Sequence, residues 1–334
     1  MKSPITGKPM QLTKERRSMD FRKETFEIVF HYFKCPDSGE QFTTTTLDEV
    51  NMNQVFNQYR DKFNIPFPDE IISIREKYGL SAAKMSEILG LGINSYRQYE
   101  AGEMPSVANA KLIQMVNEPN IFIEMVALCS SLDNKAKIKY KKQAQLLLEE
   151  KGRNMVDLMF TAYLLGNQFA DIYSGYKNPN LEKVTEMVVY YSGKLSPFKT
   201  KMNKLLFYAD FAMFKQSCFS ISGMRYKAID MGSETNNFQS IFEYLVNKSE
   251  IEIITTEFPN GYTGEQFKTK NDRAFNAALF SEKELITLEK VANIFKTTST
   301  SEIIEMSHLE NAWKKNVNEK SAISYEYAFE LKQI

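Results

Sequence analysis

The chain has 334 residues, and its 42 Lys and Arg residues balance its 42 Asp and Glu residues, so the formal net charge is zero. Hydrophobic residues make up 43% of the chain and charged residues 25%, which excludes wholesale disorder and predicts two or three domains. No run approaches the roughly 20 apolar residues of a membrane span, and the first residues lack an apolar signal core. We therefore expect a cytoplasmic protein without a membrane partner, in which any DNA contact comes from a local patch.

Cysteine and histidine residues are few and scattered. The cysteines are Cys35, Cys129 and Cys218, and no two of them have the C-x₂-C spacing of a structural zinc site. The histidines are His31 and His308, and Cys129 and Cys218 lie in apolar stretches where thiols are usually inert. Neither common glycine-rich phosphate loop occurs. We expect no cofactor and no enzymatic activity, and we interpret the chain as a binding or regulatory protein.

The first 62 residues are predicted to contain β structure followed by a helix. Apolar residues alternate with others at period two between residues 26 and 32, which indicates a half-buried strand. Turn signals flank this region at residues 4–9 and 35–40. From Thr46 the pattern is helical and ends before Pro66.

Four short helices are predicted between residues 69 and 117. They comprise Glu70–Lys77, a helix capped by Ser81, Ile93–Glu100 and a helix that begins at Ser106. The residues expected to face the interior are Met85, Ile88, Leu89, Ile93, Tyr96, Tyr99, Ala108, Leu112, Ile113 and Val116.

The second and third of these helices have the pattern of a helix-turn-helix. The glycine-rich turn 90–92 separates a supporting helix from a second helix whose first residues are polar and able to reach base edges. Asn and Gln can pair with adenine, and Arg with guanine. A small helical bundle that binds no DNA is the alternative. The candidate DNA-binding residues are Lys84, Asn94, Ser95, Arg97 and Gln98.

Residues 120–177 are predicted to be mostly helical, with a break at Ser130-Ser131. Five lysines lie in the eight positions from Lys135 to Lys142. This run is either a solvated helix face or a phosphate-contacting patch. The segment from Ser174 to Asn180 has the composition of a linker, and we place a domain boundary there.

The last part of the chain is predicted to mix helices and strands. The expected helices are Val184–Ser192, Thr200–Lys215, one opened by a capping box at Ser281, and Ser301–Met306. The expected strands are Arg225–Met231 and Ile251–Phe258, the latter paired with Gln266–Lys268 across the turn Pro259-Asn260-Gly261.

Residues 70–116 resemble the Xre-type helix-turn-helix of HigA- and MqsA-type bacterial antitoxins and repressors. The resemblance rests on the segments 74–81, 89–92 and 96–103. In the MqsA-like branch, an Asn at the start of the recognition helix and an Arg four residues later read bases. Asn94 matches the first position, but Gln98 stands at the second, so the resemblance implies a different base preference there.

The first 60 residues resemble the zinc-binding N-terminal domain of the MqsA/YgiT type. The matching segments are 3–7, 35–40 and 57–60. Ser3, Thr6 and Ser38 replace three of the four ligand positions, and only Cys35 remains. Because hydroxyls are poor zinc ligands beside thiolates, we expect a ribbon that keeps its shape without metal, held by hydroxyl hydrogen bonds and the apolar face of the hairpin.

Residues 181–320 resemble the Panacea, or SocA-like, domain of antitoxins. The resemblance rests on segments 203–210, 221–228 and 307–314, whereas the family's Gly-Pro step is replaced near Met231-Gly232-Ser233. The toxin-binding residues that it suggests are Lys204, Tyr208, Asp210, Arg225 and Tyr226; ordinary helix packing with exposed charges is the alternative for the first three. We interpret His308 and Trp313 as structural.

These observations predict a mainly α protein with small β elements (α+β): a ribbon-like β-hairpin, a five-helix-type helix-turn-helix, and a helical C-terminal domain with a small sheet. The expected domains are 1–62, 68–120, a helical connector 121–177, and 178–334. The resemblances imply an antitoxin of a type II toxin–antitoxin system, a homodimer that neutralises a protein toxin and represses its operon at operator DNA. A ligand-sensing transcription regulator and a proteolysis adaptor are the alternatives.

Overall fold

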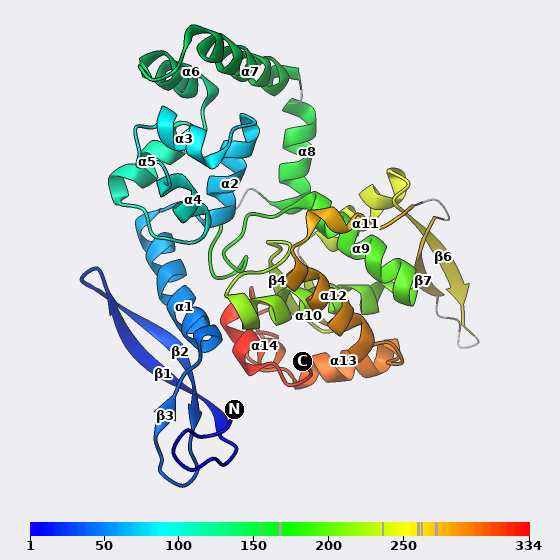
Figure 1. Cartoon of the computed structure of the whole chain (residues 1–334). Helices are drawn as coiled ribbons and strands as arrows, with labels where there is room; N and C mark the ends of the chain where they lie inside the picture. Colours follow the sequence, from blue (N-terminus) through cyan, green and yellow to red (C-terminus); the bar gives the residue numbers. More distant parts are fainter. Residues whose placement is uncertain (154, 167–168, 236, 259–260, 262, 271–272) are drawn as a thin grey trace. The chain divides into compact units, whose positions relative to one another are not determined.

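The computed structural model describes residues 1–153, 155–166, 169–235, 237–258, 261, 263–270 and 273–334, except for the side chains of 150–158. These residues form helices and three small sheets, ordered β1-β2-β3, β4-β5 and β6-β7, which confirms the predicted α+β class (Figure 1). The chain divides into two compact units. One contains Leu12–Phe30 and Asn51–Phe160; the other contains Met1–Gln11, His31–Val50 and Thr161–Ile334. The four domain limits stay a prediction.

A long hairpin opens the chain. Strand β1 (Gln11–Phe21) joins β2 (Glu24–Lys34) through Arg22-Lys23, and β2 also pairs with the short β3 (Gln41–Phe42). The predicted alternation holds at the start of β2, where Phe26 and Ile28 are buried, but His31 and Tyr32 are both buried, so it breaks there. The charged sequence of β1 gave no strand signal, because pairing with β2 rather than side-chain pattern makes it a strand.

Helix α1 (Thr45–Phe63) confirms the predicted helix and packs on the hairpin with an unusually polar inner face. The Gln54 side chain accepts a hydrogen bond from the Val29 backbone N–H and donates one to the Val29 carbonyl, both at 2.9 Å. This amide therefore satisfies both backbone groups of one residue of β2. The apolar core here consists of Phe26, Ile28, Val55, Tyr59, Ile65, Met104 and Ala110.

Five helices then follow in the fully described range 68–128: α2 (Pro68–Lys77), α3 (Ala82–Ile88), α4 (Ser95–Glu100), α5 (Val107–Met115) and α6 (Pro119–Leu128). Helix α7 (Asn134–Arg153) contributes Ala144 to their shared core, and α8 (Met155–Leu165) comes next. The break between α6 and α7 confirms the interruption predicted at Ser130-Ser131.

The predicted caps are confirmed, and two predicted core positions are wrong. The Ser81 hydroxyl accepts from the Lys84 backbone N–H at 3.2 Å, and Ser106 caps α5 in the same way. Ile93 is 74% exposed because α4 begins only at Ser95, so the helical spacing does not extend back to it. Ala108 is also exposed, and Ala110 takes the inward position of α5 instead.

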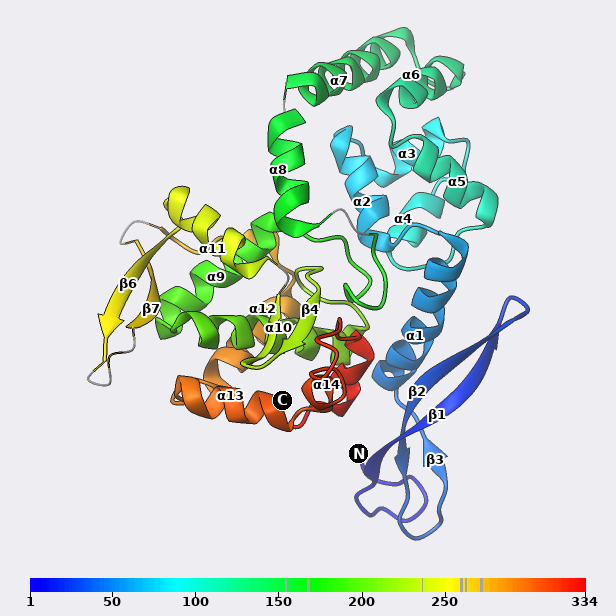
Figure 2. The ribbon, with the colours of Figure 1, turned by 180° about the vertical axis from the view of Figure 1, so that it is seen from behind.

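In the second unit, a single helix forms the centre. Helix α10 (Lys199–Ser217) is buried from residue 201 to 214, and α9 (Leu181–Leu195), α12 (Glu282–Ile294), α13 (Thr300–Leu309) and the 3₁₀ turn η2 (Tyr325–Glu330) pack around it (Figure 2). Both predicted helices are thus present, but α10 has no solvated face along this stretch. The capping box at Ser281 is confirmed at the start of α12.

The strands of this unit differ in part from the prediction. The single strand expected at Arg225–Met231 is a hairpin of β4 (Tyr226–Ile229) and β5 (Gly232–Thr235), because the chain reverses at Asp230-Met231 and Ile229 pairs with Gly232. Strands β6 (Ile251–Glu257) and β7 (Thr263–Thr269) pair antiparallel as predicted. Pro259 and Asn260 of the predicted turn lie outside the described residues. Helix α11 (Phe238–Asn247) was not predicted.

The remaining elements are short. They are η1 (Ala277–Leu279) and α14 (Asn311–Lys314). The segment predicted as a linker begins with a packed turn: Ser174, Gly175 and Tyr176 are buried, and the Ser220 backbone N–H donates to the Gly175 carbonyl at 3.0 Å. Its first three residues are therefore part of the fold of this unit rather than an exposed connection.

Candidate nucleic-acid interface and C-terminal polar core

Helix α4 presents the polar face that a recognition helix requires. Asn94, Arg97 and Gln98 are exposed, whereas Tyr96 and Tyr99 on the other side are buried. Ser95 is half-buried. The structure thus brings the four predicted base-reading residues together at one short helix and its N-cap.

Hydrogen bonds to three other helices hold α4 on its buried side. The Tyr96 hydroxyl donates to the Ile71 carbonyl of α2 at 2.9 Å, and the Tyr96 backbone N–H donates to the Ser86 hydroxyl of α3 at 3.1 Å. Asn109 of α5 donates to the Tyr99 hydroxyl at 2.9 Å. These bonds leave α4 little freedom to turn about its axis, which is what readout of base edges needs.

Two of the predicted DNA-binding side chains bond within the protein. The Arg97 guanidinium donates to the Asn94 side-chain oxygen at 2.9 Å, so binding of bases by either side chain requires this bond to be exchanged. Lys84 forms an ion pair with Glu87 at 2.5 Å, and this bond raises the pKa of the lysine. Lys84 is therefore a weaker candidate for a phosphate contact than its sequence position indicated.

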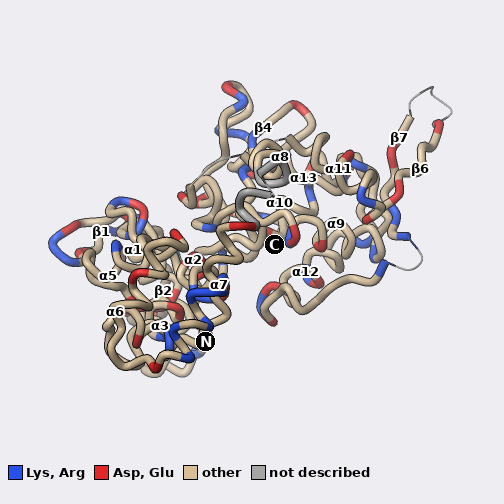
Figure 3. The backbone as a smooth tube through the Cα atoms, turned by 90° about the horizontal axis from the view of Figure 1, so that it is seen from above, with Lys and Arg blue, Asp and Glu red and all other residues tan. Residues whose placement is uncertain are grey.

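The lysine run lies in the first half of α7 (Figure 3). Lys135, Lys139 and Lys142 are exposed, whereas Lys137 donates to the Ala127 carbonyl at 3.0 Å. Ala144, near the end of the run, is buried in the helical core. A solvated helix face accounts for this arrangement.

The structure brings together the four positions that the resemblance assigns to zinc ligands, Ser3, Thr6, Cys35 and Ser38. The Ser3 hydroxyl accepts from the Thr6 backbone N–H at 3.3 Å, and Ser38 accepts from the Glu40 backbone N–H at 3.4 Å. The Thr6 hydroxyl lies 3.5 Å from the Cys35 sulfur. Hydrogen bonds from Ser3, Ser38 and Thr6 lower the pKa of the Cys35 thiol to about 6. Hydroxyl hydrogen bonds thus connect both turns of the ribbon.

In the C-terminal part, the polar residues of α10 form an internal network. Asp210 is completely buried and accepts four hydrogen bonds, from the backbone N–H groups of Ile221 and Ser222 at 2.8 Å, the Ser222 hydroxyl at 2.5 Å and the Tyr226 hydroxyl at 2.6 Å. Burial raises the pKa of Asp210, and the bonds from Ser222 and Tyr226 oppose that shift. The carboxylate therefore fixes the loop between α10 and β4.

Lys204 lies six residues earlier on the same helix and is also buried, at 1% exposure. Its side-chain nitrogen donates a hydrogen bond to the Ser233 carbonyl of β5 at 2.6 Å. Burial lowers its pKa to about 7, although the charge of Glu234 acts in the opposite direction. A Cβ atom at Gly232 would lie 2.7 Å from the lysine Cε, so the glycine makes room for this side chain.

The burial of these residues changes the interpretation of the predicted toxin contacts. Lys204, Tyr208 and Asp210 of α10 and Tyr226 of β4 are at most 1% exposed. The alternative of ordinary helix packing with exposed charges is therefore wrong about the exposure of Lys204 and Asp210, and the toxin contacts stay a prediction. Arg225 is partly exposed and forms an ion pair with Asp171 at 2.6 Å. The internal position of α10 explains this outcome, because a helix packed on all sides buries whatever polar groups it carries.

The interpretation of His308 and Trp313 as structural agrees with their contacts. The two rings stack with centroids 4.0 Å apart. The Trp313 indole donates to the Ile229 carbonyl at 2.7 Å, and the His308 Nε2 lies 3.1 Å from the Asp230 carbonyl. Both side chains therefore hold the end of β4.

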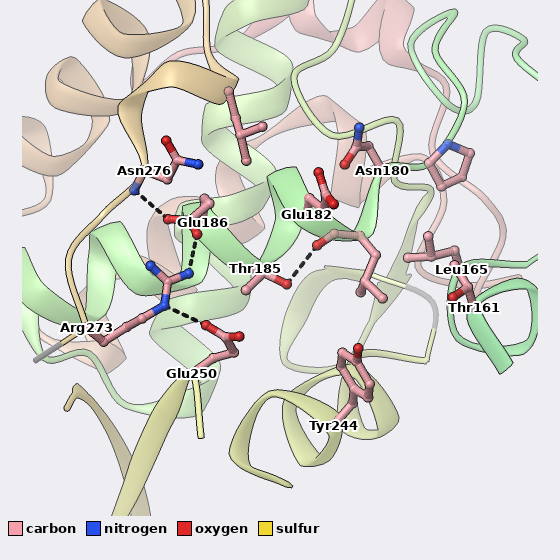
Figure 4. A pocket seen from close by; sticks show the side chains of 13 residues that line it. Thr161, Leu165, Asn180, Glu182, Thr185, Glu186, Tyr244, Glu250, Arg273 and Asn276 are labelled. Carbon is pink, nitrogen blue, oxygen red and sulfur yellow. Dashed lines mark hydrogen bonds and ion pairs between the residues drawn. The ribbon is translucent and has the colours of Figure 1, made fainter. Parts of the chain in front are cut away.

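A groove of about 680 Å³ opens beside the N-terminal end of α9 (Figure 4). Arg273 donates to Glu186 and, at 2.5 Å, to Glu250, and the Asn276 backbone N–H donates to Glu186 at 2.8 Å. Glu182 is exposed at its edge. Because these three charged side chains pair with one another and the groove is open, it is better suited to contact with a protein surface than to enclosing a small molecule.

Two segments of the chain match known family models. Residues 1–126 match the model of the antitoxin component of a bacterial toxin–antitoxin system, MqsA. Residues 202–314 match the model of the SocA-like antitoxin Panacea domain. The chain has an antitoxin domain architecture. No curated protein matches it.

The MqsA-like part does not have the donor set of a zinc site. One thiol and three hydroxyls stand at the positions that the resemblance assigns to ligands, and no group of three or more His, Cys, Asp or Glu residues suited to a metal occurs among the described residues. The metal-free ribbon stays a prediction. Elemental analysis of the purified chain should find well below one zinc per molecule, and about one zinc per molecule would contradict it.

Two features of this antitoxin architecture were missed by the sequence analysis. Ile93, exposed beside the base-reading candidates, has the apolar character that contacts thymine methyl groups. Arg22 and Arg60 bind the loop after α4, although their positions lie far away in the sequence. The exposure of Ile93 could have been inferred from its place just before the candidate recognition helix. No sequence signal indicates the contacts of Arg22 and Arg60 with the loop after α4.

Within the described ranges, none of the helices combines the length and apolar character that crossing a membrane requires.

Proposed function

We propose that the chain is the antitoxin of a type II toxin–antitoxin system. In this proposal the SocA-like Panacea domain binds and neutralises a cognate protein toxin, and the helix-turn-helix of the MqsA-like part binds operator DNA and represses the operon. The observation that carries the proposal is the pairing of two different antitoxin families in one chain, at residues 1–126 and 202–314. We place the chain in the cytoplasm and expect no catalytic activity.

The geometry of α4 supports the DNA-binding half of the proposal. Its exposed residues have both hydrogen-bond donors and acceptors, and its buried tyrosines anchor it to the helical core. A helix-turn-helix reads symmetric sites as a dimer, so we propose a homodimer on a palindromic operator. Asn94, Arg97, Gln98 and Ser95 would contact bases, with Lys84 available for phosphate once its ion pair opens.

The C-terminal domain would contact the toxin through its surface rather than through the centre of α10. Asp210, Tyr226, Tyr208 and Lys204 then contribute by holding the loop and hairpin that shape that surface, and Arg225 is the one of the five predicted residues with a partly exposed side chain. The groove beside α9, with the exposed carboxylate of Glu182 at its edge, is the surface that we propose for the contact.

Co-expression with the product of the neighbouring gene tests the toxin-binding half. The full chain should restore growth of cells that express this product and should purify with it as a stable complex. A chain with Glu182→Lys should lose most of the complex, whereas Glu319→Lys, which changes an exposed carboxylate in the last twenty residues, should not. Neither growth rescue nor co-purification by the unchanged chain would contradict the proposal.

A further inference from the structure

Two arginines from outside the helix-turn-helix bind the loop that follows α4. The Arg22 guanidinium donates to the carbonyls of Met104 and Pro105, both at 3.0 Å. The Arg60 guanidinium donates to the carbonyl of Gly102 at 2.7 Å. Arg22 lies in the turn between β1 and β2 and Arg60 in α1, and all these residues belong to one compact unit. The loop therefore has three of its carbonyls held from outside.

The same loop continues the hydrogen bonding of α4. The backbone N–H of Ala101 donates to the Arg97 carbonyl at 3.0 Å, and that of Glu103 donates to the Gln98 carbonyl at 2.9 Å. Arg97 and Gln98 are two of the proposed base-reading residues. A shift of the loop would thus move the last turn of α4 directly.

The backbone conformation of Arg22 is energetically unfavourable, which indicates that the contacts of its side chain matter at this position. Arg22 and its neighbour Lys23 have φ angles of 48° and 69°. This left-handed conformation costs an L residue with a Cβ roughly 1 kcal/mol or more, and two-residue hairpin turns favour Asn-Gly for that reason. The geometry of the turn does not explain why an arginine stands at this position. The two carbonyls that its guanidinium binds explain it.

Arg60 is equally unusual because it is only 2% exposed. Burial lowers the pKa of its guanidinium to about 10, an effect that the charge of Asp69 opposes. Besides the Gly102 carbonyl, it donates to the Asn57 side-chain oxygen at 3.2 Å. The apolar core beneath joins Phe26 of the hairpin to Met104 of the loop, so packing and hydrogen bonds act on the same segment.

We propose that the β1–β2 hairpin and α1 form a brace that sets the position of α4 on DNA, with Arg22 and Arg60 as its positioning residues. This inference rests on the DNA-binding half of the proposed function. Contacts to base edges require a fixed helix position, whereas attraction to phosphates depends mainly on charge. Loss of the brace should therefore weaken discrimination between DNA sequences and leave non-specific binding almost unchanged.

The test compares Arg22→Asn/Lys23→Gly with Lys23→Gly alone. Both variants relax the turn and lose Lys23, and both should fold because Asn-Gly and Arg-Gly each place glycine at a position of positive φ. Only the double variant loses the guanidinium. Arg60→Ala is less useful, since removal of a buried arginine is expected to disturb folding.

Two DNA probes separate positioning from phosphate contact. One is a duplex from the region upstream of the chain's own gene, and the other is a shuffled duplex of equal length and composition. Relative to Lys23→Gly, the double variant should bind the upstream duplex about tenfold more weakly, the equivalent of one charge-assisted hydrogen bond. Its affinity for the shuffled duplex should stay within about twofold, with the same salt dependence. Equal loss on both probes, with a salt slope lower by about 0.9, would make Arg22 a phosphate contact and overturn the brace.

A measurement without DNA keeps the brace separate from the proposed function. Amide hydrogen exchange at Ala101, Gly102 and Glu103 should be faster in the double variant than in Lys23→Gly, because the loop is no longer held. Unchanged exchange would overturn the brace. An unchanged chain that does not prefer the upstream duplex would instead contradict the proposed repression, and the exchange result would then decide the brace by itself.

Discussion

Helices α4 and α10 both carry the polar residues that the sequence marks as binding residues, but the structure places the two sets oppositely. On α4 three of four base-reading candidates are exposed, whereas Lys204, Tyr208 and Asp210 of α10 are almost completely buried. Helix α4 has six residues with one face against the core, whereas the nineteen-residue α10 is buried on all sides from residue 201 to 214. Similar polar residues are thus available for binding in one helix and hold the fold together in the other.

This contrast separates two uses of hydrogen-bonding groups. A polar side chain at the surface bonds to water until a ligand replaces that water, so it has little effect on the stability of the free protein. A buried one must find its partners within the fold, and Asp210 does so with four donors. Mutations on α10 should therefore change stability, and mutations on α4 should change binding.

The largest effect is expected for Asp210→Ala. Removal of the carboxylate leaves two backbone N–H groups and two hydroxyls without their acceptor in a buried place, which should lower the free energy of unfolding by about 3 to 4 kcal/mol. Urea unfolding of the purified chain measures this. Asp230→Ala is the control, because that carboxylate is 81% exposed, and it should change stability by less than about 0.5 kcal/mol. Similar values for both variants would contradict an internal role for Asp210.

Lys204→Met should change how stability depends on pH. The pKa of Lys204 is about 7 in the folded chain, well below its ordinary value of 10.5. Between these two pH values the unfolded chain binds a proton that the folded chain does not, so this lysine makes stability rise with pH. Unfolding free energies measured from pH 7 to 10 should therefore rise more in the unchanged chain than in Lys204→Met. Parallel pH profiles would contradict the buried, deprotonated lysine.

Asn94→Ala should act on binding alone. Loss of an amide that pairs with a base is expected to weaken binding to the upstream duplex by about 1 to 3 kcal/mol, while the unfolding free energy stays the same within about 0.5 kcal/mol. Titration of labelled duplex and urea unfolding give the two numbers. Asn120→Ala, at an exposed asparagine of α6, should change neither. Unchanged DNA binding by Asn94→Ala would contradict the assignment of α4 as the recognition helix.

The smallest effect on stability is expected for Ile93→Ser. Because 74% of Ile93 is exposed, the polar replacement should cost less than about 0.5 kcal/mol in urea unfolding. A loss of about 2 kcal/mol or more would place Ile93 in the core, as its spacing from Tyr96 predicts, and would remove the contrast between the two sides of α4.

Much of the local structure was readable from the sequence. Caps at Ser81, Ser106 and Ser281 specify where helices begin, because a short hydroxyl side chain satisfies a backbone N–H that the helix leaves unpaired. The candidate residues of α4 follow from the same logic, since a sharp glycine turn and a short polar helix are local features. The hairpin β6–β7 was predicted for this reason too.

Other elements could not be predicted from the local sequence, because residues far away in the chain determine their structure. Strand β1 has a charged sequence and is a strand through its pairing with β2. The packed turn that starts at Ser174 has linker composition, but it is buried by the loop around Ser220, 46 residues later. Helix α11 lies between two strands, in a stretch for which the sequence pattern predicted no element.

The sequence by itself determined the kind of protein: no globally basic surface, a helix-turn-helix, and two segments similar to different antitoxin families. The tertiary structure alone decided which polar residues are available to a partner. The net charge of zero could not show which residues are available, because a charge total does not distinguish an exposed Arg97 from a buried Lys204. Exposure depends on what packs around each helix, and for α10 and the loop after α4 that packing comes from residues far away in the chain.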